Sequence, residues 1–399
     1  MKGETAADVL PVSGAHVSRG GFREAAVRLW PLVAFGCVPV LAAWIYLSPY
    51  ADQHALGLDF KGTLWEPAQA ILDGRSPYPD PSLAAITNGA PAVYPPPAML
   101  AALPLGLLPW QAAAAVWAVL LVAGVVAALR LLGVHDWRCY AIALVSTPVL
   151  MGVGLGNLSI ALVPLAALAW RYRDRWLVAG CAVGTLAAAK IFLWPLALWF
   201  VLTRRYRAAV AAALSAAALL VISWAAIGFR GLADYPQLIR SLDRLYAGHS
   251  YSLVTLGRAA GIGRASSLLP LAALAVVISI AVAVSRKPDA DRSVFALAVV
   301  ASLAATPVLW PHTLALLLVP IAVISPRLGP LWFAPLLLWV AEAMPSPETA
   351  TRTCCRPADM SPFAWTTLSG PSALVPSLGA AVLLTVVVIV AVSRRGGSA

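Results

Sequence analysis

The sequence predicts an all-α membrane protein, a polytopic bundle of about 12 transmembrane helices. Its composition is 61% hydrophobic and 11% charged, whereas soluble domains contain about 25% charged residues. Uncharged stretches such as residues 29–51 are long enough for a helix to cross a hydrocarbon layer of about 30 Å, which takes about 20 residues. Short clusters of Lys and Arg separate these stretches, as expected of cytoplasmic turns.

The net charge of +11 is predicted to lie on one side of the membrane. If the basic clusters are cytoplasmic, the outer segments contain equal numbers of acidic and basic residues, so the whole surplus is inside. The surplus is spread over several short loops and forms no patch, which argues against nucleic acid as a partner. We therefore expect a multi-pass protein of the cell membrane with both termini in the cytoplasm.

The chain is predicted to form one integral domain, residues 29–393, between cytoplasmic tails at 1–28 and 394–399. The apolar run after the first tail has about 20 residues, which is too long for the core of a cleaved signal peptide. The five cysteines show no zinc spacing, and we expect neither a metal nor a cofactor. Outer loops are predicted at residues 50–93, 229–267 and 345–371.

After the first span, the next helix is predicted not to cross the membrane. Residues 98–129 are uncharged but contain Pro104 and Pro109, and proline ends helices. The part before Pro109 is too short to span, so we place it as a re-entrant or interfacial helix on the outer side, and residues 110–129 cross inward. The remaining unbroken spans are predicted at residues 140–154, 158–170, 208–227, 268–284, 294–307, 314–324, 331–344 and 372–392.

Residues 176–203 predict a helix that is broken near Lys190. One continuous helix would be about 42 Å long at 1.5 Å per residue. It would place the basic cluster at 204–207 outside, against the positive-inside rule. Two short helices that meet in an outer-facing turn avoid this conflict. Lys190 at such a break either lines a functional cavity or extends to the outer headgroups.

The first outer loop contains five acids, which are Asp52, Asp59, Glu66, Asp73 and Asp80. One of them, Asp59, is placed where it could act in catalysis. Glu66 and Asp73 fall at the ends of a short helical pattern. Asp59 follows soon after the first span, where partial desolvation would raise its pKa and allow its carboxylate to accept a proton from an attacking hydroxyl. The alternative is an ordinary loop aspartate.

Cations are expected at the same outer face, and they are Lys190, Arg240, Arg244, Arg258, Arg264 and His312. Fixed cations opposite a carboxylate suit group transfer from a phosphate leaving group, because they stabilise the negative charge that develops on it. For each arginine alone, contact with a lipid headgroup is the favoured interpretation, whereas His312 fits a polar residue packed beneath Trp310 as well as it fits a site residue. A nucleotide-binding glycine motif, a G-x-S-x-G motif and HExxH are absent from the sequence.

A series of short motifs between positions 55 and 325 resembles glycosyltransferase family 87. The motifs are, in order, Asp59, GRSPY at 74–78, YPPP at 94–97, Gly156-Asn157, GTLAAAK at 184–190 followed by Pro195, and TPVLWPH at 306–312. Members of this family are polytopic GT-C enzymes, including actinobacterial mannosyl- and arabinofuranosyltransferases that use polyprenyl-phosphate sugars. The family usually has Gly-Gln where this chain has Gly-Asn.

The resemblance implies an inverting transfer of mannose or arabinofuranose on the outer face, from a polyprenyl-phosphate donor to a hydroxyl of a cell-envelope glycan or glycolipid. Asp59 matches the general base, and Lys190 and His312 match polar positions around the lipid phosphate. We add Arg258 as a further phosphate partner. The substrate-binding positions expected within these motifs are Tyr78, Tyr94, Asn157 and Trp310.

A transporter or flippase of a lipid-linked sugar is the alternative function. Such a protein would need ionisable groups near the middle of the membrane and a repeated half, and the sequence shows neither.

Overall fold

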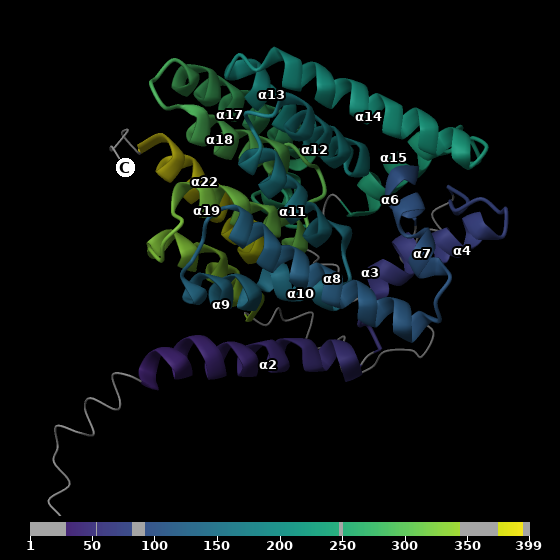
Figure 1. Cartoon of the computed structure of the whole chain (residues 1–399), viewed down its shortest axis with the longest axis horizontal. Helices are drawn as coiled ribbons and strands as arrows, with labels where there is room; N and C mark the ends of the chain where they lie inside the picture. Colours follow the sequence, from purple (N-terminus) through teal and green to yellow (C-terminus); the bar gives the residue numbers. More distant parts are fainter. Residues whose placement is uncertain (1–28, 53, 82–91, 247–249, 344–373, 394–399) are drawn as a thin grey trace, which may run out of the picture.

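The computed structural model describes residues 29–52, 54–81, 92–246, 250–343 and 374–393. Every regular element in these residues is a helix, which confirms the all-α prediction for the described part of the chain. Figure 1 shows most of the helices gathered into one bundle, with α2 (Val38–Asp52) along its lower edge.

Four helical stretches in the described residues are long and apolar enough to cross a membrane: Leu29–Asp52, Trp110–Leu131, Tyr206–Ala226 and Gly263–Ser285. A bent pair, α9 (Trp137–Val145) and α10 (Thr147–Leu155), would make a fifth span. Several shorter apolar helices accompany them. The chain is thus a multi-pass membrane protein by these lengths and compositions, while the count of about 12 spans remains a prediction.

The centre of the bundle is formed by α11 (Leu158–Arg171), α12 (Trp176–Ala189) and α18 (Asp291–Ala304). All residues of α18 from 294 to 304 are buried. By contrast, α2 has no buried residue, and large apolar side chains such as Trp44 are exposed on it. A helix that is apolar all round and exposed is explained by contact with lipid.

The helices α12 and α14 (Tyr206–Ala226) pack closely along their length. A Cβ added at Gly180 would lie 2.6 Å from the Cβ of Ala211, and one added at Gly184 would lie 2.5 Å from the carbonyl oxygen of Ala212. Glycines four residues apart let two membrane helices approach at backbone distance. Because Gly180 and Gly184 face successive turns of α14 in the same order, the two helices run parallel and begin at the same end of the bundle.

The predicted break at Lys190 is present. Lys190 has an extended backbone (φ −140°, ψ 103°) between α12 and the short helices η3 (Ile191–Leu193) and α13 (Leu196–Leu202). Two other elements differ from the prediction. The span expected at 140–154 is two helices bent by 61°, because Ser146 is extended and Pro148 starts a new first turn.

The second difference is in the segment before α8 (Trp110–Leu131). The single re-entrant helix expected there is two short helices, α6 (Pro96–Ala101) and α7 (Leu103–Gly106). Pro104 lies in the first turn of α7, so it starts a new helix and ends the previous one.

The remaining described helices are η1 (Val33–Cys37), α3 (Leu58–Phe60), η2 (Lys61–Trp65), α4 (Glu66–Leu72), α15 (Tyr235–Tyr246), α16 (Leu253–Ala259), η4 (Gly263–Leu268), α17 (Leu269–Ser285), η5 (Pro311–Leu317), α19 (Leu318–Ile324), η6 (Pro330–Leu336), α20 (Leu337–Ala343) and α22 (Leu374–Ser393).

Candidate active site

Asp59 lies in the first turn of a helical segment that follows α2, formed by α3, η2 and α4. Gly57 starts this segment with a left-handed backbone (φ 73°), and its N–H donates to the carbonyl of Gly154 at 2.7 Å. The next residue after the aspartate, Phe60, is fully buried and stacks on Trp117 at 5.3 Å between ring centroids. These contacts hold Asp59 inside the bundle, where it is only 4% exposed.

The motif Gly156-Asn157 joins two helices at the same place. Gly156 ends α10 in a left-handed conformation (φ 70°), and a Cβ there would lie 2.7 Å from the Cβ of Phe60. Both facts require glycine. Asn157 begins α11 as its N-cap, because its Oδ1 accepts a hydrogen bond from the N–H of Ser159 at 2.9 Å. Glutamine is a poorer N-cap residue than asparagine, so the capping of α11 explains why this chain has Asn157 where the family usually has glutamine.

The amide of Asn157 connects the predicted base with a predicted cation. Its Nδ2 donates to Asp59 Oδ2 at 2.7 Å and to the hydroxyl of Tyr94 at 3.1 Å. Its Oδ1 accepts from Ser159 and lies 3.5 Å from Lys190 Nζ. All hydrogen-bonding positions of the amide are therefore used, and the cap fixes which end faces Asp59.

The side chain of Lys190 points into the bundle and is buried there. It is 8% exposed, and its Nζ donates to Ser159 Oγ at 2.6 Å. The ammonium also lies over the ring of Tyr94, 5.0 Å from the centroid, a cation–π contact. We call Asp59, Tyr94, Asn157, Ser159 and Lys190 the buried cluster.

His312 lies beside this cluster, on η5. It is 4% exposed, and the charge of Lys190 acts on its imidazole. The neighbouring Thr313 places its Oγ1 3.5 Å from Ser159 Oγ. His312 Nδ1 is buried and has no hydrogen-bond partner among the described residues. Such an atom costs about 1–3 kcal/mol in a folded protein unless a ligand or water satisfies it.

Aromatic side chains border the buried cluster. The hydroxyl of Tyr78 donates to the carbonyl of Tyr94 at 3.0 Å, and its ring stacks on Trp224 at 5.4 Å between centroids. Trp310, half-buried next to the His312 helix, meets the ring of Tyr246 edge-on at 5.8 Å. Tyr78 is thus one contact away from the cluster, through Tyr94.

Arg258 is exposed on α16. Its charge acts on Asp243, a partly buried carboxyl of α15. Within the described part of the chain, no hydrogen bond or ion pair joins Arg258 to the buried cluster. Its role at a phosphate therefore stays a prediction with less geometric support than Lys190 and His312 have.

Burial raises the pKa of the Asp59 carboxyl to about 6, while the hydrogen bond from Asn157 and the charge of Lys190 oppose that rise. The carboxylate is therefore deprotonated at neutral pH and more basic than an exposed one. A carboxylate in this state is suited to accept a proton from a hydroxyl.

Ser159 and Thr313 were not predicted as site residues, although each lies within two residues of a predicted site residue, Asn157 or His312.

The chain is similar to two mycobacterial enzymes. Both are named polyprenol-phosphate-mannose-dependent alpha-(1-2)-phosphatidylinositol pentamannoside mannosyltransferase. The protein of Mycolicibacterium smegmatis (strain ATCC 700084 / mc(2)155) is 28% identical over 240 residues, which are 55% of this chain and 54% of that protein. The protein of Mycobacterium tuberculosis (strain CDC 1551 / Oshkosh) is 25% identical over 364 residues, 83% of this chain and 76% of that protein.

The match with the Mycolicibacterium smegmatis protein thus covers about half of the length of that protein. No solved structure matches it. The profile of glycosyltransferase family 87 matches residues 92–311, which include Tyr94, Asn157 and Lys190; Asp59 precedes the matched region and His312 directly follows it. Because this match covers more than half of the chain, the protein belongs to glycosyltransferase family 87.

Proposed function

We propose that this protein is an inverting membrane glycosyltransferase that moves mannose, or a sugar of the arabinofuranose class, from a polyprenyl phosphate to a hydroxyl of a glycolipid or cell-envelope glycan. The observation that supports it best is the buried cluster, in which Asn157 joins the carboxylate of Asp59 to the ammonium of Lys190. The names of the relatives favour mannose as the sugar and a phosphatidylinositol mannoside as the acceptor.

In the proposed reaction, Asp59 is the general base. Asn157 occupies Oδ2 of the carboxylate, so Oδ1 is the atom that takes the proton from the acceptor hydroxyl. The acceptor oxygen forms a bond to the anomeric carbon as the bond from that carbon to the phosphate oxygen breaks. Attack on the face opposite the leaving group inverts the anomeric centre. The products are the glycosylated acceptor and polyprenyl phosphate, and the proton stays on Asp59.

Lys190 and His312 are proposed to bind the phosphate of the donor. The ammonium stabilises the charge that develops on the leaving oxygen, and its low-dielectric surroundings strengthen this attraction relative to water. His312 has a buried Nδ1 with no partner among the described residues, so a phosphate oxygen within hydrogen-bond distance would satisfy the imidazole. Arg258 is the weaker candidate because it is exposed on α16.

Tyr78, Tyr94 and Trp310 are proposed to contact the sugars. Sites for small molecules combine apolar and aromatic walls with a few fixed polar groups, and the rings around the buried cluster offer this combination. Asn157 is proposed to contact the substrate only after giving up one of its present hydrogen bonds, since all of them are used.

The site is proposed to face outside, with both termini and the turn before α14 in the cytoplasm and about 12 spans in total. Cysteine labelling in a cysteine-free background tests this orientation. Ser76 and Tyr206 are both exposed in the structure, so a cysteine at either position is open to a reagent on its own side of the membrane. An impermeant thiol reagent added to intact cells should therefore label a Ser76→Cys variant and not a Tyr206→Cys variant. Labelling of the second variant would overturn the orientation.

A transfer assay tests the function itself. The purified protein is incubated with polyprenyl-phosphate mannose, arabinofuranose, glucose or galactose and a phosphatidylinositol mannoside acceptor, in the presence of excess EDTA. We expect transfer from mannose or arabinofuranose, with an inverted linkage, and none in the Asp59→Asn variant. Movement of the lipid donor across a vesicle membrane without any transfer would favour the flippase alternative.

A further inference from the structure

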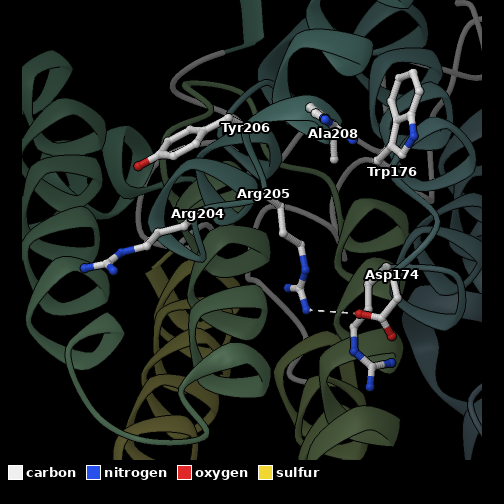
Figure 2. A pocket seen from close by; sticks show the side chains of 8 residues that line it. Asp174, Trp176, Arg204, Arg205, Tyr206 and Ala208 are labelled. Carbon is white, nitrogen blue, oxygen red and sulfur yellow. Dashed lines mark hydrogen bonds and ion pairs between the residues drawn. The ribbon is translucent and has the colours of Figure 1, made fainter.

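A second charged site lies at the far end of α12 from Lys190. The helix has 14 residues, which is about 21 Å at 1.5 Å per residue. A cavity of about 420 Å³ opens there, and Figure 2 shows the side chains that line it. We call it the basic pocket, and its lining residues are Arg173, Asp174, Trp176, Arg204, Arg205, Tyr206, Arg207 and Ala208.

Two helices begin in this pocket. Trp176 is the first residue of α12 and Tyr206 is the first residue of α14, and neither helix has a side-chain hydrogen bond at its N-cap. Because the two helices run parallel, their first-turn N–H groups and the positive ends of their dipoles lie side by side. Such ends favour a bound anion.

The arginines of the pocket are only partly neutralised. Arg205 pairs with Asp291 at 2.5 Å and with Asp174 at 3.4 Å, and Arg173 pairs with Asp291 at 3.2 Å. Arg204 and Arg207 are exposed and form no ion pair within the described residues. In Figure 2, Arg205 extends towards Asp174 while Arg204 extends away from it. Two guanidinium groups thus remain for an anion, and guanidinium groups bind phosphate with paired N–H donors.

The surface next to the pocket is apolar and points to a lipid. Trp176 and Tyr206 are 48% and 61% exposed, and large exposed apolar residues continue along the same two helices, among them Leu177, Val210 and Leu214. Tyr206 begins a candidate span and Trp176 begins a shorter apolar helix, and exposed Trp and Tyr at the ends of membrane helices are typical of the membrane–water interface. A free phosphate would use the arginines but not this apolar surface.

We propose that the basic pocket binds the phosphate of an anionic membrane phospholipid, whose acyl chains lie along the exposed residues of α12 and α14. Arg204 and Arg207 bind the phosphate oxygens, the first turns of the two helices add N–H donors, and Trp176 and Tyr206 lie at the level of the headgroup. The site is separate from the buried cluster and requires neither the transferred sugar nor its donor.

Native mass spectrometry of the detergent-solubilised full chain tests this proposal by resolving individual bound lipids. Phosphatidylglycerol should bind at least tenfold more tightly than phosphatidylcholine, and inorganic phosphate should compete only weakly. The double variant Arg204→Gln/Arg207→Gln should lose about tenfold or more of the phosphatidylglycerol affinity, which is about 1.4 kcal/mol or more, because both charged donors to the phosphate are removed. The matched control is Arg286→Gln/Lys287→Gln, which removes the same charge at exposed positions at the end of α17.

Equal affinity of the double variant and the control would overturn the proposal. Phosphate that competes as well as the lipid would show an anion site without lipid specificity and would also overturn it. A photoactivatable phosphatidylglycerol supplies a measurement on the unmodified protein. Its cross-links should map to peptides that contain residues 173–178 and 204–214, and cross-links confined to other helices would exclude the basic pocket.

Discussion

Asp59 and Asp291 each hold together segments that are far apart in the sequence, but with different partners. Asp291 accepts hydrogen bonds from the guanidinium of Arg205 at 2.5 and 3.0 Å and from Trp199 Nε1 at 2.6 Å, with Arg173 also in contact. Asp59 has no direct ion pair in the described residues, and its carboxylate is held by the neutral amide of Asn157.

The difference shows how a fold separates a structural carboxylate from one that is proposed to react. Direct pairing with two guanidinium groups neutralises Asp291 and occupies both of its oxygens. A neutral donor holds Asp59 in place, and the charge of Lys190 compensates the carboxylate only in part, so burial still raises its pKa. The ammonium of Lys190 lies one amide away from this carboxylate, and in the proposed mechanism it acts on the leaving group from there.

The strongest test of this contrast is Asp59→Asn. The variant keeps the shape of the side chain but cannot accept a proton, so the transfer rate should fall by about 10²–10⁴ with folding and insertion unchanged. Single-turnover rates with the lipid donor measure this. The control is Asp73→Asn, an exposed acid in the same segment between α2 and α8 whose ion pair among the described residues is with Arg75, and this variant should be active. Activity of Asp59→Asn near that of the control would remove Asp59 from the mechanism.

The next largest effect is expected for Lys190→Ala, which should lower kcat/KM for the lipid donor by about 10²-fold or more because the leaving phosphate loses its charge partner. Lys190→Arg should keep part of the activity, since charge survives while shape changes. The affinity for the acceptor should not change in either variant. A Lys190→Ala variant with wild-type kcat/KM would leave His312 as the better phosphate ligand.

A smaller effect, on pH dependence, is expected for Asn157→Ala. In the wild type, kcat/KM should rise as pH increases through about 6, because the base acts only when deprotonated. Removal of the Asn157 hydrogen bond, which lowers the pKa of Asp59, should move this acidic limb to higher pH. A purely structural role would lower the rate at every pH equally. An unshifted limb in the variant would therefore argue against Asn157 as a positioning residue.

The smallest effect on catalysis is expected for Asp291→Asn. The two arginines lose their common carboxylate, so the melting temperature should fall by a few degrees. The transfer rate of the folded fraction should stay at the wild-type level because the site lies at the other end of α12. Thermal unfolding followed by tryptophan fluorescence measures the loss of stability, and the transfer assay at low temperature measures the activity of the folded variant. A large loss of kcat in the folded variant would contradict the division between the two aspartates.

Much of the fold could be predicted from the sequence because its signals are local. The helix break at Lys190 follows from length and the positive-inside rule, and α8 begins directly after Pro109 as expected. The bend between α9 and α10 was missed, since a proline such as Pro148 can start a helix or bend one, and the sequence does not say which.

The candidate site was predicted as a set of residues but not as an arrangement. The hydrogen bond from Asn157 to Asp59 crosses 98 positions, and the contact of Ser159 with Thr313 crosses 154. No periodicity or spacing within either segment indicates such a pairing. The family motifs pointed to the individual residues, while the packing of α3 against the start of α11 and the end of α12 is needed to show that Asn157 lies between Asp59 and Lys190.

The 98-residue separation between Asp59 and Asn157 also has a consequence for biogenesis. Synthesis at about 5–20 residues per second separates the appearance of the two residues by about 5–20 s. During that interval the nascent chain carries a carboxylate without its amide partner, and Lys190 follows later still. The buried cluster is therefore complete only once Lys190 has been translated, and a chain truncated before Asn157 contains the proposed base but not the amide that holds it.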